Sequence, residues 1–131
     1  MRLLLDTHIW LKAVDRPEML SRRVRRQLES PQNELYLSPI SIWEAHHLAR
    51  KRKLRAEPNF STWLERTLAL VPVKEAPVNF AAAIEVSRME LPQSDLGDLL
   101  LAATALVFDL TLVTADRQLI ACPWLKTLAD E

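Results

Sequence analysis

Short apolar runs recur along the chain and predict strands. A strand inside a parallel sheet is covered on both faces, so it appears as a compact hydrophobic run rather than an alternating one. The segment at residues 3–5 is the clearest case, because three consecutive leucines end at Asp6. The expected strands are residues 3–5, 34–37, 70–73, 111–113 and 125–128.

Longer segments between these runs carry apolar residues at helical spacing. Ser38-Pro39 has the form of a helix N-cap followed by proline at the first helical position, and Asp95 or Ser94 can cap the most apolar helix. Residues 91–94 break the chain before that helix. The expected helices are residues 8–14, about 17–29, 39 to about 54, 59 or 61 onward through 68, 79–89, 96–108 and 116–120. Short strands alternating with helices predict an α/β fold with a parallel sheet.

Composition narrows the class of protein. At 131 residues one domain is expected, and a single glycine excludes both Gly-rich phosphate-binding loops, GxGxxG and Walker A. The lone Cys122 cannot form an intrachain disulfide, which suits a cytoplasmic protein. The first residues do not resemble a signal peptide, and the longest apolar run, residues 99–108, is too short to span a membrane.

The formal net charge is zero, but the charge is unevenly distributed. Residues 20–55 hold nine basic and three acidic side chains, a net charge of +6. Such a stretch is either the solvated face of two helices or a surface for a polyanion, and charge alone favours the first interpretation. The basic residues are Arg22, Arg23, Arg25, Arg26, Arg50, Lys51, Arg52, Lys53 and Arg55.

Four carboxylates stand at the ends of predicted elements. Asp6 and Asp116 follow strands, Glu44 lies near the start of a helix that leaves a strand, and Asp98 lies in the first turn of the most apolar helix. In parallel sheets these positions meet at the carboxyl edge, where ligands bind. Converging carboxylates repel one another, and a hard divalent cation such as Mg²⁺ or Mn²⁺ removes that repulsion. The chemistry expected of such ions is phosphoryl transfer.

Each acid also has a purely structural interpretation. Asp6 and Asp116 can cap the helices that follow them, and Asp98 lies three residues after Asp95, as in a capping box. Glu44 can be an exposed helix residue, although the lack of a basic residue four positions later favours a role in a site. Spacing alone supports a metal site only as a hypothesis.

Four segments that contain these acids resemble the PIN-domain ribonuclease family, most closely its VapC-like toxin branch. They are LLLDTHIWL (3–11), LSPISIWEAHHL (37–48), SDLGDLLLAATAL (94–106) and LVTADRQL (112–119), and they follow the family's order and spacing. The resemblance implies a single PIN domain over residues 1–131, a three-layer α/β/α sandwich around a five-stranded parallel sheet. It also implies a metal-dependent endoribonuclease.

The resemblance assigns roles to individual residues. Asp6, Glu44, Asp98 and Asp116 match the catalytic acidic quartet, with Asp6 and Asp98 as direct ligands of Mg²⁺ or Mn²⁺. Glu44 and Asp116 are then ligands or water-mediated partners. Two threonines beside the acids, Thr7 and Thr114, match positions whose hydroxyl groups support the site.

One segment departs from the family pattern. Where relatives usually read D-P-x-D-R, this chain reads Asp95-Leu96-Gly97-Asp98-Leu99, which keeps the acid and lacks both the proline and the arginine. The arginine that would pair with Asp98 is therefore missing, and what orients this carboxylate is left open.

The partners implied are an RNA substrate, a cognate antitoxin that lays a peptide over the acidic groove, a second copy in a homodimer, and no membrane. The expected RNA-binding residues are Arg22, Arg23, Arg25, Arg26, Arg50, Lys51, Arg52 and Lys53. Trp10, Trp43 and Trp63 are expected in the core or an interface, with stacking on an RNA base open to one of them.

Two rival functions are a catalytically silent PIN module and a phosphoryl-accepting receiver domain. The receiver domain is disfavoured because Asp6 is followed by Thr7-His8 rather than by a second acid.

Overall fold

The computed structural model describes residues 1–91 and 95–131. Its sheet has five parallel strands in the order β3-β2-β1-β4-β5. The strands are β1 (Arg2–Leu5), β2 (Glu34–Leu37), β3 (Lys74–Glu75), β4 (Thr111–Thr114) and β5 (Thr127–Ala129). Because β1 is central and β4 lies directly beside it, the residues that follow these two strands emerge next to each other at the carboxyl edge.

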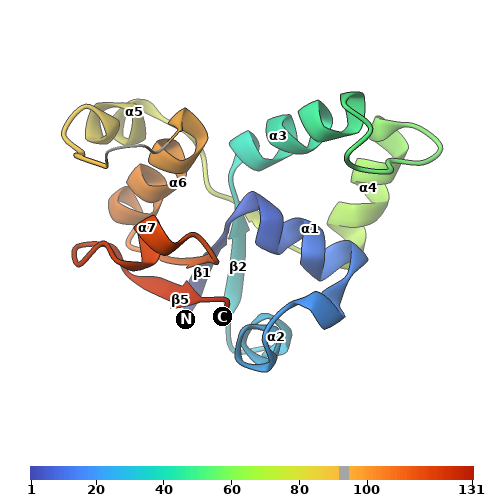
Figure 1. The fold of residues 1–131 in the computed structure, drawn as a ribbon, viewed down its shortest axis with the longest axis horizontal. Coiled ribbons are helices and arrows are strands. Elements are labelled where there is room, and N and C mark those ends of the chain that lie inside the picture. Colours follow the sequence, from blue (N-terminus) through green and yellow to red (C-terminus); the bar gives the residue numbers. More distant parts are fainter. Residues whose placement is uncertain (92–94) are drawn as a thin grey trace.

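Helices cover both faces of this sheet. They are α1 (Thr7–Asp15), the 3-10 turn η1 (Pro17–Met19), α2 (Arg22–Glu29), α3 (Pro39–Arg50), α4 (Phe60–Leu70), α5 (Phe80–Val86), α6 (Leu96–Val107) and α7 (Arg117–Ile120). Figure 1 shows α5, α6 and α7 on one side of the strands and α1 to α4 on the other. The predicted three-layer α/β/α sandwich around a five-stranded parallel sheet is confirmed.

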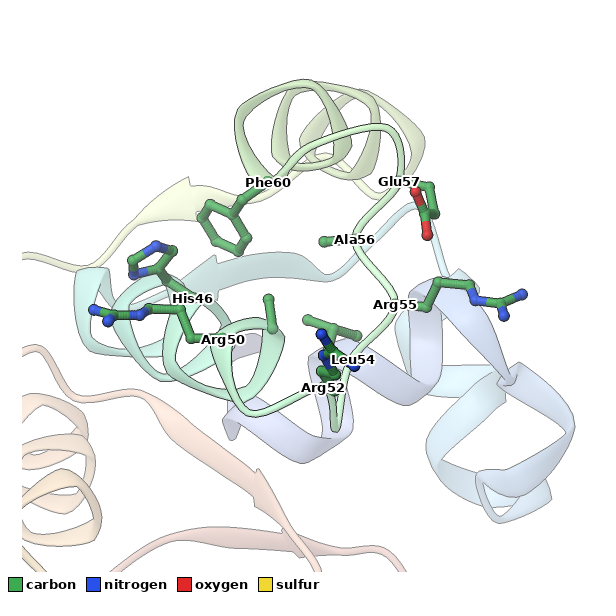
Figure 2. A pocket seen from close by; sticks show the side chains of 9 residues that line it. His46, Arg50, Arg52, Leu54, Arg55, Ala56, Glu57 and Phe60 are labelled. Atoms are coloured by element: carbon green, nitrogen blue, oxygen red, sulfur yellow. The ribbon is translucent and has the colours of Figure 1, made fainter.

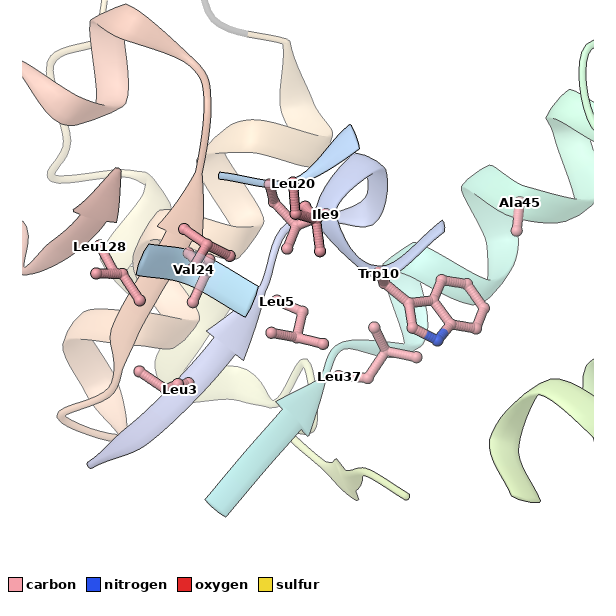
Figure 3. Packing of buried hydrophobic residues seen from close by; sticks show 10 residues of the cluster. Leu3, Leu5, Ile9, Trp10, Leu20, Val24, Leu37, Ala45 and Leu128 are labelled. Atoms are coloured by element: carbon pink, nitrogen blue, oxygen red, sulfur yellow. The ribbon is translucent and has the colours of Figure 1, made fainter. Parts of the chain in front are cut away.

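The alternating side chains of β1 explain why the sheet needs two helical layers. Leu3 and Leu5 pack with Ile9 and Trp10 on one face, whereas Leu4 packs with Leu101 on the other. Figure 3 shows the first of these clusters, in which Leu5 and Leu37 lie near Trp10. All of these leucines are buried, so β1 has no polar face, as a central parallel strand requires.

Two predicted helices end earlier or divide. The helix expected over residues 17–29 is split, because Leu20 is extended (φ −82°, ψ 148°) and the Ser21 hydroxyl caps α2 by accepting from the Val24 N–H. The helix expected to run to about residue 54 ends at Arg50. There Arg52 adopts a left-handed conformation (φ 58°), and its N–H and that of Lys53 close back onto the helix carbonyls.

The predicted strand at residues 70–73 is wrong. Leu70 still belongs to α4, and the edge strand β3 follows at Lys74–Glu75. A short apolar run at the end of a helix has no periodicity of its own, so the sequence pattern does not separate the two states. The last strand also lies two residues further on, at Thr127–Ala129, and the helix expected over 79–89 ends at Val86. Of the predicted break at 91–94, residues 92–94 lie outside the described residues.

The tryptophans fall into two groups. Trp10 is buried and meets Trp63 edge to face, with 5.9 Å between ring centroids, so both belong to the core below α3 and α4. Trp43, by contrast, is 67% exposed on α3 and stacks on His47. None of the helices that the structure describes is long and apolar enough to cross a lipid bilayer.

Candidate active site

Side chains from four distant parts of the chain line one pocket of about 290 Å³ at the carboxyl edge of the sheet. The four predicted acids are all among its lining residues, and Asp95 adds a fifth carboxylate. The lining residues are Asp6, Thr7, His8, Ile9, Glu44, Asp95, Asp98, Ala115 and Asp116. The predicted convergence of the quartet is therefore what the structure shows, while the roles of the four acids as ligands stay predictions.

Asp6 is held by both of its carboxylate oxygens. Oδ1 accepts a hydrogen bond from the His8 N–H (3.1 Å), which caps α1, and Oδ2 accepts from the Thr114 hydroxyl (2.7 Å). The Thr114 oxygen in turn accepts from the Asp116 N–H (3.0 Å). The capping and site interpretations of Asp6 are thus compatible, because the cap occupies one oxygen and orients the other toward β4.

Glu44 is positioned by a chain of two hydroxyl groups. The Thr7 hydroxyl donates to Glu44 Oε1 (2.6 Å), and the Ser41 and Thr7 oxygens are 2.8 Å apart. Since the single Thr7 proton goes to the carboxylate, Ser41 must donate to Thr7. Ser41 is fully buried and was not singled out from the sequence. Its position three residues before Glu44, on the same helix face, was the available signal.

The only glycine in the chain lies against Glu44. A Cβ at Gly97 would stand 3.0 Å from Glu44 Oε2 and 3.4 Å from Asp95 Oδ1. Gly97 has an ordinary helical backbone, so what it provides is space rather than conformational freedom. The absent side chain lets the start of α6 approach the carboxylate on α3.

Asp98 and Asp116 both occupy helix starts. The Asp98 N–H donates to Asp95 Oδ1 (2.8 Å), so Asp95 is the cap of α6 and Asp98 lies one turn further on. Asp116 caps α7, with Oδ1 accepting from the N–H groups of Gln118 and Leu119. The partial positive charge of a helix N-terminus favours carboxylates at such positions.

Burial and the neighbouring carboxylates together disturb the ionisation of Asp98. The pKa of Asp98 is raised to about 7, first because burial removes water from its carboxylate. The negative charges of Asp95, Asp6, Asp116 and Glu44 raise it further, in that order. Leu99, the next residue on α6, offers no compensating charge.

The donors suit a hard divalent cation by type and charge. They are all carboxylate oxygens, and the raised pKa of Asp98 shows negative charge that a cation would neutralise. Within the described residues, however, no three acidic, imidazole or thiol groups are close enough to hold an ion as they stand. An ion held here would therefore need one or two carboxylates with water completing its shell, or a shift of the side chains.

The two basic clusters lie in different places. Figure 1 shows α2, which carries Arg22, Arg23, Arg25 and Arg26, near the amino ends of the strands. The acidic pocket lies at the opposite, carboxyl edge of the sheet. Arg50 instead ends α3, the helix that carries Glu44, and residues 51–55 follow it. None of these nine basic side chains forms an ion pair with another described residue.

Comparison with known proteins identifies the family. The PIN domain profile matches residues 3–125, nearly the whole chain. The chain belongs to the PIN domain family. Comparison with curated proteins finds no significant match.

Solved structures share the fold of this PIN domain. A chain of VapBC2 from Rickettsia felis, bound to a DNA fragment from its promoter, superposes with a TM-score of 0.76 at 21% identity. VapBC-1 from nontypeable Haemophilus influenzae gives 0.70 at 21% identity, and VapBC-5 from Mycobacterium tuberculosis, a toxin–antitoxin system, gives 0.63 at 18%. In each case 98% of both chains is covered. At these identities the likeness establishes the fold.

Proposed function

We propose that this PIN domain is a metal-dependent endoribonuclease and the toxin of a toxin–antitoxin pair. One observation carries the proposal: Asp6, Glu44, Asp98 and Asp116, which are far apart in sequence, line a single pocket with Asp95. Membership of the family supports the same conclusion. So does the likeness in fold to VapBC structures.

In this proposal, the residues of the pocket hold a cation beside the RNA substrate. Asp6 and Asp98 would bind Mg²⁺ or Mn²⁺ directly, with Glu44 and Asp116 as ligands or water-mediated partners. A bound ion of this kind supplies Lewis acidity and a water molecule of lowered pKa. The Thr114 and Thr7 hydroxyls keep the Asp6 and Glu44 carboxylates in fixed orientations, so little reorganisation is needed when charge changes in the pocket.

Cleavage of a labelled RNA by the purified protein tests the proposal. We expect cleavage with Mg²⁺ or Mn²⁺ and none with EDTA, and we expect Asp6→Asn and Asp98→Asn to lose activity while remaining folded. Asp15→Asn is the matched control, because Asp15 is an exposed acid at the far end of α1. Cleavage in EDTA, or full activity in both pocket variants, would contradict the proposal.

A protein antitoxin is the proposed partner. The pocket concentrates negative charge, so a basic side chain of a bound peptide would be attracted to it when no metal is present. The VapBC structures named above support such a partner by their likeness in fold. An arginine-containing peptide should therefore compete with Mg²⁺ for the pocket, and Asp98→Asn should weaken that competition.

A homodimer is proposed from exposed apolar side chains on the helices beside the pocket. Phe80 and Ile84 lie on α5, Leu96 starts α6 and Trp43 lies on α3, and all four are more than half exposed. A contiguous exposed apolar patch marks an interaction site, and we propose that these four side chains contribute to one. The helices α3 and α6 carry Glu44 and Asp98, so a second copy here would border the acidic pocket.

A second function is favoured by a specific observation. Because no three acids of the described residues are already gathered for an ion, a catalytically silent PIN module that binds RNA or a protein is the alternative. Calorimetric titration with Mn²⁺ separates the two. Heat of binding that disappears in Asp98→Asn supports the nuclease, whereas no binding to the wild-type protein supports the silent module.

A further inference from the structure

A second pocket, of about 540 Å³, lies where α3 ends and α4 begins. We propose that this basic pocket, formed by His46, Arg50, Arg52, Arg55, Glu57 and Phe60, holds an unpaired nucleotide of the RNA, away from the phosphodiester bond that is cleaved. The proposal rests on the proposed nuclease function and adds to it a substrate subsite.

Charge is the first reason for a nucleotide. Three arginines and one glutamate line the pocket, and none of the four is ion-paired among the described residues. Figure 2 shows Arg52 and Arg55 along the loop that follows α3, with Arg50 on the last turn of the helix. Arginine binds phosphate oxygens with two parallel N–H groups, so uncompensated guanidinium groups fit a phosphate backbone.

The aromatic wall is the second reason. Phe60 points into the pocket from the first turn of α4, close to His46 on α3 (Figure 2). Its ring contacts His46 edge to face at 5.0 Å and Trp63 at 5.5 Å, and Trp63 contacts the buried Trp10. The ring is therefore anchored before any ligand arrives. Unpaired bases stack on such rings and on guanidinium planes. Bases inside a duplex do not, because their faces are already stacked on neighbouring bases.

The position relative to the acids is the third reason. Glu44, His46 and Arg50 all lie on α3, and six residues of helix separate Glu44 from Arg50 by about 9 Å along the axis. Both pockets thus take side chains from α3, Glu44 in the acidic pocket and His46 and Arg50 in the basic pocket. A strand of RNA that passes along this helix would place a flanking nucleotide in the basic pocket.

The backbone conformation of Arg52 allows a substitution that removes a guanidinium group without destabilising the fold. Arg52 holds a left-handed conformation (φ 58°) at the position that closes the end of α3, where glycine is usual. Arg52→Gly relieves this strain while removing a guanidinium group. Stability should be unchanged or higher, so weaker RNA binding could not be explained by unfolding. Phe60→Leu removes the ring but keeps an apolar contact with Trp63. Arg88→Ala removes an arginine from the opposite helical layer and is the control.

Binding of a fluorescent mixed-sequence RNA oligonucleotide in EDTA, without cleavage, is the measurement. We expect Phe60→Leu to weaken binding at least about fivefold. Arg52→Gly should lower the slope of log affinity against log salt by about 0.7 per lost phosphate contact. Arg88→Ala should show neither effect. With a duplex of the same sequence, Phe60→Leu and Arg52→Gly should bind as the wild-type protein does.

Three results would overturn the inference. They are no RNA binding by the wild-type protein in EDTA, unchanged binding in both pocket variants, or equal losses for single-stranded and duplex RNA. If the pocket variants instead lost only the binding of an acidic peptide, tested as a second probe, the pocket would be assigned to a protein partner. Cleavage of RNA by the wild-type protein with Mn²⁺, measured in parallel, tests the proposed function separately. Cleavage with unchanged binding in the variants rejects only the subsite.

Discussion

Thr114 donates a hydrogen bond to Asp6 across 108 positions of sequence, with 2.7 Å between Oγ1 and Oδ2. Both side chains are buried at the ends of neighbouring parallel strands, β4 and β1. The same hydroxyl oxygen accepts the Asp116 N–H. One threonine therefore links the first and the last acid of the predicted quartet, and it does so through the pairing of two strands.

Replacing Thr114 by valine tests this link. Valine keeps the shape but removes the donor to Asp6 and the acceptor of the Asp116 N–H, so we expect a loss of about 1–3 kcal/mol of stability. We also expect slower metal-dependent cleavage. Urea denaturation and cleavage rates provide the two readouts. Thr114→Ser should retain both properties, and Thr111→Val, at the other end of β4, should affect cleavage little. Wild-type activity in Thr114→Val would show that the hydroxyl does not position Asp6.

Asp98→Asn should stabilise the metal-free protein. The raised pKa of Asp98 means that its charged form is unfavourable in the folded state. Its partial exposure screens the repulsion, so we expect a gain of about 1 kcal/mol at pH 8, seen as a higher Tm. Mg²⁺ should raise the Tm of the wild-type protein and much less that of the variant. A lower Tm in Asp98→Asn without metal would contradict an unfavourable charged form of Asp98 in the folded protein.

The same group gives a dependence on pH with a definite sign. Asp98 has a pKa of about 7 when folded, against about 3.9 when unfolded. Between these values the folded protein holds a proton that the unfolded chain has lost, so this contribution to stability falls as pH rises from about 4 to about 7. Above pH 7 it stays low. Chemical denaturation of the metal-free protein across this range should show the difference between wild type and Asp98→Asn growing with pH. A constant difference would refute it.

Gly97→Ala should separate stability from activity. Alanine favours helix over glycine by about 1 kcal/mol, but its Cβ would press on Glu44 Oε2 at 3.0 Å. We expect stability within about 1 kcal/mol of wild type and slower cleavage, because Glu44 must shift from the Thr7 hydroxyl. In a Glu44→Ala background, the same change should raise stability, because the close contact with Glu44 Oε2 is gone. Full activity in Gly97→Ala would show that the close approach is unimportant.

Phe80→Asp should weaken the proposed homodimer. Phe80 is 89% exposed, so a charge there should change monomer stability by less than about 0.5 kcal/mol. Sedimentation equilibrium should nevertheless show a shift toward monomer. Met19→Asp, an exposed apolar residue on η1, is the matched control and should leave association unchanged. Equal association in both variants would place the interface elsewhere.

Sequence patterns predicted most of the fold because its central elements are strongly marked. Leu3-Leu4-Leu5 has no polar position and ends at Asp6, as expected of a strand buried on both faces. The misassigned strand at 70–73 had no such mark, because Leu70 and Val71 end a helix with the same residue types that form a strand. The continuous helix expected over 17–29 was divided at Ser21 by one side-chain hydrogen bond, a local competition that periodicity does not register.

For the site, the sequence by itself predicted which residues would carry the chemistry. Asp6, Glu44, Asp98 and Asp116 were identified from their places at element ends and from the resemblance, since the parallel topology sends those ends to one edge. Only the tertiary structure decided how these carboxylates are held and how unfavourable their charged forms are in the folded protein. The Thr114–Asp6 bond, the Ser41–Thr7–Glu44 chain and the fit of Gly97 against Glu44 join segments that are remote in sequence. The raised pKa of Asp98 likewise depends first on burial and then on the distances between charges, and both exist only once the chain has folded.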